Sequence, residues 1–232
     1  MVTTDFTFQD ALQYAGVPQN RVTKVPMLAP EKGTAIRGSH DVERTYFLWT
    51  TNLAAHKNHR RALAALQLYY EVYGGKLDCH VTGVGSTEII KSQSPHLEGL
   101  NRVVAGSRAL RLHVKFLGDL PDEVYRRELA HAAFLWHPAE LDNGTFSVVE
   151  AAHFGVPALS SDYPAMREMD QQFELGLTFM NHEDPENMAT ELQGMQINLA
   201  ERRRTVATEE KLEGQSVQHL AQSYWKAVRE FL

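Results

Sequence analysis

The chain has 232 residues, 43% of them hydrophobic and 22% charged, which is enough to bury a core and excludes an intrinsically disordered chain. Its 23 basic and 29 acidic residues give a net charge of −6, which disfavours general binding to nucleic acid backbones. Cys79 is the single cysteine, so an internal disulfide and a cysteine-based zinc site are excluded and a reducing compartment is expected.

The sequence shows neither a membrane-spanning segment nor a secretory signal. No apolar run reaches the roughly 20 residues that a membrane-spanning helix requires, and the first ten residues lack the pattern of a secretory signal peptide. We therefore expect a soluble, cytoplasmic protein.

Residues 1–40 are interpreted as an entering linker or packing segment. A short helix is expected around 8–15, after which Gly16, Pro18, Pro26 and Pro30 interrupt regular structure. The segment therefore differs from the regular pattern that follows it.

Residues 41–200 alternate short β-rich runs with helical patterns, which is typical of a parallel sheet covered by helices. The helices are expected mainly at 59–73, 121–131 and within 142–154, and the strands at 45–50, 77–82, 112–117, 133–136, 156–161 and 176–180. This order predicts the α/β class, with a doubly wound parallel sheet in a single Rossmann-like domain.

Residues 201–232 are predicted to form a C-terminal helix, continuing a helical and charged pattern that is broken near Gly214. Trp225, Val228 and Leu232 fall on one face of it, and we expect that face to dock against another surface.

Two loops after predicted strands carry candidate ligand-binding residues, because open α/β sheets bind ligands at the carboxyl ends of their strands. Lys57 follows the first strand and could bind an anion, although a lone loop lysine is more often a solvated surface charge. Gly83 and Gly85 follow the second strand and resemble the start of a dinucleotide fingerprint, but Glu88 replaces its third glycine. A tight turn near a ligand and a purely structural turn both remain open.

The segment 142–150 is the most informative part of the sequence. Asp142 precedes a loop that opens a helix, and Glu150 follows one or two turns inside that helix. Backbone amides at a helix start favour phosphate, and carboxylates accept hydrogen bonds from hydroxyl groups. The alternative is that Thr145 or Ser147 simply caps the helix and Glu150 faces solvent.

The run 138–161 resembles the signature of retaining glycosyltransferases of the GT-B fold, family 4, often called group 1. In that family an acidic residue, seven intervening residues and a glutamate precede a small-residue helix and a Gly-x-Pro turn. Asp142, Glu150 and the turn at Gly155 match these positions. The loop lysine, the Gly-x-Gly turn and the segment 116–121 match earlier elements in the same order, so the similarity covers roughly 45–168.

The resemblance implies that the chain is the C-terminal, donor-binding half of a GT-B enzyme, with the N-terminal acceptor-binding domain missing from it. The implied donor substrate is a nucleoside-diphosphate sugar, and neither a cofactor nor a metal is expected. The implied activity is that of a retaining hexosyltransferase of polysaccharide biosynthesis, acting on a glycan or lipid-linked acceptor. Such an acceptor would place the full enzyme in the cytoplasm at the inner membrane face.

The resemblance also assigns roles to residues. Lys57 would meet the diphosphate, Asp142 would orient the donor sugar, and Glu150 would hold the ribose hydroxyls, which makes these three the catalytic set. The remaining substrate-binding positions are Asn52, Gly83, Gly85, Leu117, Gly118, Asn143, Gly144, Thr145, Phe146 and Ser147.

Two positions depart from the family pattern. The family usually carries an arginine where Asn52 stands, and it commonly has glutamate where Asp142 stands. Two other functions therefore stay open: a non-catalytic nucleotide-binding or assembly module, and a GT-B sugar-nucleotide epimerase.

Overall fold

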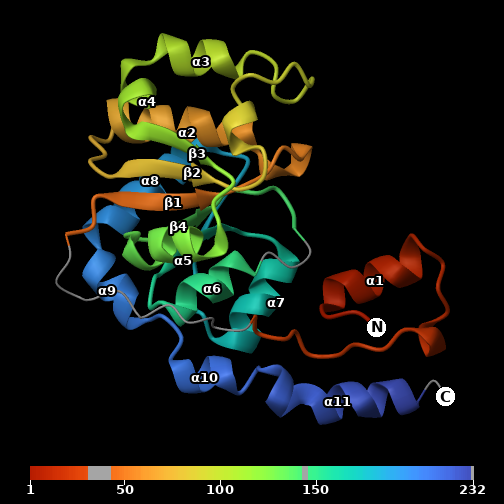
Figure 1. Ribbon diagram of the computed structural model, residues 1–232. Helices are drawn as coiled ribbons and strands as arrows, with labels where there is room; N and C mark the ends of the chain where they lie inside the picture. The colour runs from red at the N-terminus through yellow and green to blue at the C-terminus, as the bar shows by residue number, and fades with distance from the viewer. Residues whose placement is uncertain (31–42, 143–145, 231–232) are drawn as a thin grey trace.

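Six parallel strands form one sheet in the computed structural model, which describes residues 1–30, 43–142 and 146–230 (Figure 1). The strands are β1 (Tyr46–Thr50), β2 (Asp78–Thr82), β3 (Val114–Gly118), β4 (Leu135–His137), β5 (Ala158–Ser161) and β6 (Thr178–Met180). Their order across the sheet is β3-β2-β1-β4-β5-β6, with Leu48 of β1 beside Leu135 of β4. The strand order therefore reverses between β1 and β4, which is where open parallel sheets bind ligands.

Helices cover both faces of this sheet (Figure 1). One face carries α2 (His59–Glu71), α3 (Leu100–Gly106), α4 (Arg108–His113) and α8 (Pro185–Ile197). The other carries α5 (Asp122–His131), α6 (Ser147–His153) and α7 (Pro164–Phe173). The predicted doubly wound α/β architecture is confirmed.

The central strand β1 explains why the core has two halves. Its side chains alternate, so Phe47 and Trp49 enter the cluster under α2 and α8, whereas Leu48 enters the cluster under α5, α6 and α7. All three are at most 1% exposed. Each such burial contributes about 1.5 to 3 kcal/mol. A strand buried on both faces needs a continuous apolar run, and this is the pattern that the sequence shows.

The start of the third strand was predicted wrongly. Ser107 caps a helix, since its Oγ accepts a hydrogen bond from the backbone N–H of Leu110 at 3.1 Å. Leu112 and His113 consequently belong to α4, and β3 begins at Val114. Alternation of apolar and polar residues alone does not reveal this helical turn.

The terminal segments pack beside the sheet domain. The carboxylate of Glu168 in α7 accepts hydrogen bonds from the first backbone N–H groups of α1 (Asp5–Gln13), at 2.6 and 3.0 Å. The chain ends in α9 (Leu199–Arg204), α10 (Glu209–Glu213) and α11 (Val217–Arg229), and the break predicted near Gly214 lies between the last two. Figure 1 shows α1 and the end of α11 extending to the same side of the molecule.

The predicted docking face of the last helix is only partly realised. The Tyr224 hydroxyl donates to the carbonyl of Pro26 at 2.6 Å, which fixes α11 to the entering segment. Trp225, however, is 57% exposed, so this side chain does not dock within the described part of the chain, and Leu232 lies outside the described residues. Within the described ranges, no helix combines the length and apolar character needed to cross a membrane.

Candidate functional site

A hollow of about 280 Å³ lies at the carboxyl edge of the sheet, between the end of β1 and the start of α6. It is lined by Thr50, Thr51, Asn52, Lys57, Phe146, Ser147 and Glu150. All but Thr50 and Thr51 belong to the site that the sequence predicts. The hollow lies at the switch point because β1 and β4 are neighbours and the chain enters α6 after β4.

Lys57 and Asp142 form an ion pair through Lys57 Nζ and Asp142 Oδ2. They come from the loops that follow neighbouring strands, Lys57 at the end of the 3-10 turn η2 (Ala55–Lys57). Their side chains are only 11% and 19% exposed. Partly desolvated charges require a partner, so each residue holds the other in place. Lys57 lines the hollow, whereas Asp142 is not one of its lining residues.

Asn58 holds these two loops together, and the sequence analysis missed it. Its backbone is left-handed, with φ of 60°, a conformation that asparagine tolerates better than most residues. Its buried amide donates to the carbonyls of Pro138 at 3.1 Å and His182 at 2.8 Å. An asparagine directly before a helical apolar pattern is a helix-start signal that could have drawn attention to it.

Glu150 is held by a residue from another helix. Its Oε2 accepts a hydrogen bond from the Tyr125 hydroxyl of α5 at 2.9 Å. Burial and the neighbouring Glu150 carboxylate raise the pKa of Tyr125 well above its ordinary value, so the hydroxyl keeps its proton and donates. The alternative in which Glu150 is a solvent-facing helix position is therefore disfavoured.

Ser147 is the first helical residue of α6, and Phe146 rather than Ser147 occupies the cap position. The Ser147 Oγ is buried and has no hydrogen-bond partner among the described residues, and the residue Ser147 is one of those that line the hollow. A buried hydroxyl of this kind is costly unless a ligand or water pairs with it. Ser147 is therefore suited to contact a polar ligand.

The buried His59 contacts Thr51, which lines the hollow. Its Nε2 lies 3.1 Å from Thr51 Oγ1, and burial lowers the pKa of His59 to about 4. Burial and the nearby Lys57 likewise lower the pKa of His137 at the end of β4. Both rings are consequently neutral near pH 7, so neither adds a positive charge beside Lys57.

The two predicted glycine segments lie farther along the same edge and do not line the hollow. Gly83 has φ of 121°, and a Cβ there would lie 2.1 Å from the carbonyl oxygen of Thr51. Its N–H donates to the carbonyl of Gly118 at 3.0 Å. These contacts favour a structural role for the Gly83 turn. Of the other predicted positions, Gly85 lies beside Gly83, and Leu117 and Gly118 lie at the end of β3. The predicted positions Asn143, Gly144 and Thr145 lie outside the described residues.

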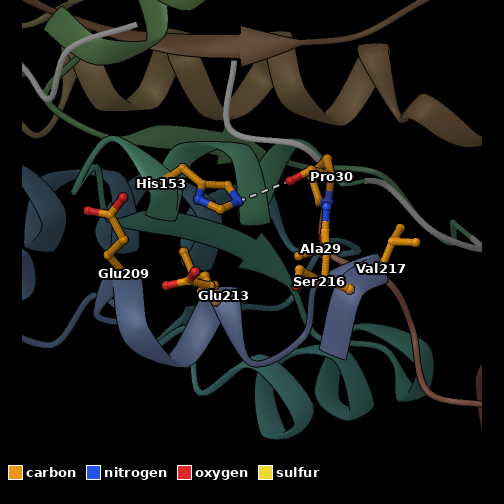
Figure 2. Close-up of a pocket in the computed structure, with 9 residues that line it drawn as sticks. Ala29, Pro30, His153, Glu209, Glu213, Ser216 and Val217 are labelled. Atoms are coloured by element: carbon orange, nitrogen blue, oxygen red, sulfur yellow. Dashed lines mark hydrogen bonds between the residues drawn. The ribbon is translucent and has the colours of Figure 1, made fainter. Parts of the chain in front are cut away.

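A second hollow of about 300 Å³ lies beyond the other end of α6 (Figure 2). His153, the last residue of α6, lies in its wall, with Nε2 3.2 Å from the carbonyl of Pro30. The other lining residues come from the entering segment, α10, α11 and the link between the last two: Ala29, Pro30, Glu209, Leu212, Glu213, Ser216, Val217 and Gln218. No residue of the predicted site lines it.

Over the part of the chain that the structure describes, no group of three or more His, Cys, Asp or Glu side chains could hold a metal ion.

Comparisons with known proteins agree with this topology. The sequence matches the family model for glycosyl transferases group 1 over residues 35–211, whereas a search of curated protein sequences gave no match. Sucrose-phosphate synthase from Thermosynechococcus elongatus has a similar fold, with a TM-score of 0.74 at 13% identity over 99% of this chain and 57% of that one.

Two further solved structures are similar in fold. A glycosyltransferase from Rickettsia africae ESF-5 has a TM-score of 0.71 at 12% identity, covering 98% of this chain and 62% of that chain. TarM has a TM-score of 0.70 at 13% identity, covering 97% of this chain and 42% of that chain. The present chain thus spans roughly half the length of these proteins. With a family match over most of its length and one Rossmann-like unit of the GT-B fold, the chain belongs to the glycosyl transferases group 1 family.

Proposed function

We propose that this chain binds a nucleoside-diphosphate sugar in the hollow between β1 and α6. Together with an acceptor-binding domain that is not part of the chain, it would transfer the sugar with retention to a glycan or lipid-linked acceptor. The observation that carries the proposal is the meeting of Lys57, Ser147 and Glu150 at the switch point of a group 1 chain. These three offer a cation, a hydroxyl and a carboxylate to one ligand.

The diphosphate would be met mainly by Lys57. An ammonium group has three N–H donors, and Asp142 takes one of them, which leaves donors for phosphate oxygens. When the bond between the sugar and the diphosphate breaks, negative charge grows on the departing oxygen. A fixed cation in a partly desolvated site stabilises that charge more than water does.

The sugar and the ribose would be held by the two carboxylates. Asp142 is paired with Lys57, so a sugar attached to a diphosphate bound at Lys57 would lie close to the Asp142 carboxylate. Asp142 would then orient that sugar. Glu150 would accept hydrogen bonds from ribose hydroxyls, since an ionised carboxylate is a strong acceptor. We invoke neither a protein nucleophile nor a metal.

Calorimetric titration with GDP, UDP, ADP and their sugar conjugates tests the proposal. At least one of them should bind, and Glu150→Ala should weaken that binding about tenfold or more, the cost of one or two charge-assisted hydrogen bonds. Glu201→Ala, a substitution at an exposed position of α9, is the matched control and should leave the affinity unchanged. If none of the nucleotides binds the wild-type chain, the proposal is wrong.

Asn52 is the observation that favours a second candidate, a non-catalytic nucleotide-binding module. The side chain of Asn52 is uncharged, and its Oδ1 accepts a hydrogen bond from the N–H of Ala54 at 2.9 Å. It therefore supports a turn instead of supplying a second positive charge. Coexpression with an acceptor-binding domain decides between the two, because the module would bind donor without producing a transferred sugar.

A further inference from the structure

We propose that Tyr125 is a positioning residue that turns the carboxylate of Glu150 toward the ribose, and so sets a preference for ribonucleotides over nucleotides that lack ribose hydroxyls. This inference rests on the proposed function. Tyr125 belongs to no motif in the sequence, and it reaches the site only because α5 and α6 cover the same face of the sheet.

The geometry places the Tyr125 hydroxyl at one oxygen of Glu150 only. Tyr125 Oη donates to Oε2 at 2.9 Å, and no hydrogen bond to Oε1 comes from the described residues. Glu150 also lines the hollow. One carboxylate oxygen is thus held by the protein, while the other is available to a ligand hydroxyl.

The Tyr125 ring is itself well fixed. It packs against the hydrophobic cluster beneath α5, α6 and α7, and its backbone N–H donates to the carbonyl of Pro121 at 2.9 Å, in the first turn of α5. A glutamate side chain is otherwise flexible, and fixing it on ligand binding would cost affinity. A hydrogen bond from a rigid donor to an ionised acceptor removes much of that freedom before the ligand arrives.

Tyr125→Phe separates this role from core packing, because the ring remains and only the hydroxyl is lost. The matched control is Tyr70→Phe, since the buried Tyr70 hydroxyl donates to the carbonyl of Leu77 at 3.0 Å, before the amino end of β2 and away from the hollow. Thermal unfolding of both variants checks that the fold is retained.

The experiment measures dissociation constants for a ribonucleoside diphosphate and for its 2′,3′-dideoxy counterpart with the same base. The wild-type chain should prefer the ribonucleotide about tenfold or more, and Tyr125→Phe should reduce that preference about three- to tenfold. The dideoxy nucleotide should bind the variant as it binds the wild type. Glu150→Ala should abolish the preference, and adding Tyr125→Phe to it should cause no further change.

Several outcomes would overturn the inference. An unchanged preference in Tyr125→Phe would show that the hydroxyl does not orient Glu150. Equal weakening of both nucleotides would indicate a merely structural role. Equal binding of both by the wild type would overturn the inference and leave the proposed function standing, whereas binding of neither would overturn both.

Discussion

Helix α6 separates two hollows of similar size that differ in what builds them. The hollow near Ser147 is about 280 Å³ and is lined by the end of a parallel strand, the loop after it and a helix start. The hollow beyond His153 is about 300 Å³ and is lined largely by the terminal segments (Figure 2). Size does not distinguish them. The first lies where the fold places ligands, whereas the second lies where the terminal segments pack against the domain.

The contacts around the two hollows differ in the same way. Around the first, polar groups hold other polar groups, as in the pairs Lys57 with Asp142 and Tyr125 with Glu150. Around the second, the contacts that join segments include bonds to backbone carbonyls, from the Ala29 N–H to Gln215 at 2.8 Å and from the His153 ring to Pro30 at 3.2 Å, and the burial of Leu212. Substitutions at the first should change ligand binding, and substitutions at the second should change stability.

The largest effect is expected from Lys57→Ala. Loss of the cation should weaken nucleoside diphosphate binding at least about 100-fold, because charge-assisted contacts to phosphate are among the strongest in the site. Calorimetry measures the change. The control is Lys91→Ala, which removes an exposed lysine paired with Glu88 and should have no effect. An affinity within twofold of the wild type after Lys57→Ala would contradict the assignment of the first hollow.

Leu212→Ala tests the second hollow. Leu212 is fully buried in α10, in the cluster that also contains α6, so its truncation should cost about 2 to 3 kcal/mol of unfolding free energy. Urea denaturation measures this loss. Leu112→Ala, at a position that is 62% exposed, should cost less than about 0.5 kcal/mol. Nucleotide affinity should stay within twofold of the wild-type value in both variants. A loss of affinity in Leu212→Ala alone would contradict the distinction between a ligand-binding first hollow and a structural second hollow.

A pH dependence should come from His59 beneath the first hollow. Burial lowers the folded-state pKa from 6.5 to about 4, so the unfolded chain takes up the proton first as the pH falls. The stabilisation of the fold by neutral His59 is fully present above pH 6.5 and is lost progressively as the pH falls to about 4. Between pH 7.5 and 5.0 the contribution of His59 should fall by about 2 kcal/mol.

Urea denaturation at several pH values measures this slope. His59→Gln should flatten it by that amount, whatever its effect on stability at pH 7.5. His219→Gln, on the exposed surface of α11, should leave the slope unchanged. A slope in His59→Gln equal to that of the wild type would show that His59 is not buried in its neutral form.

The smallest effect is expected from Asn52→Arg. Asn52 is exposed and lines the first hollow, so an arginine there would add a cation near the proposed diphosphate. Affinity should rise about three- to tenfold, and the gain should shrink at high salt. A salt-independent change, or none, would place the diphosphate away from Asn52.

The sequence predicted much of the first hollow and nothing of the second. Short apolar runs indicated six parallel strands, whose carboxyl ends lie at one edge of the sheet. The resemblance to group 1 glycosyltransferases then implied that Lys57, Asp142 and Glu150 share a site at that edge. Tyr125 was not predicted, because it belongs to no motif and meets Glu150 only through the packing of α5 on the same face as α6. Asn58 carries a helix-start signal, but its contact with the Pro138 carbonyl depends on the tertiary fold. The second hollow depends on how the terminal segments pack, and periodicity does not encode this.

Hydrogen exchange with and without a bound nucleoside diphosphate tests most directly which hollow is the donor site. We predict slower exchange in peptides that cover residues 50–58 and 146–151, and no change in peptides that cover 207–218. Protection of 207–218 without protection of the first two segments would contradict the account.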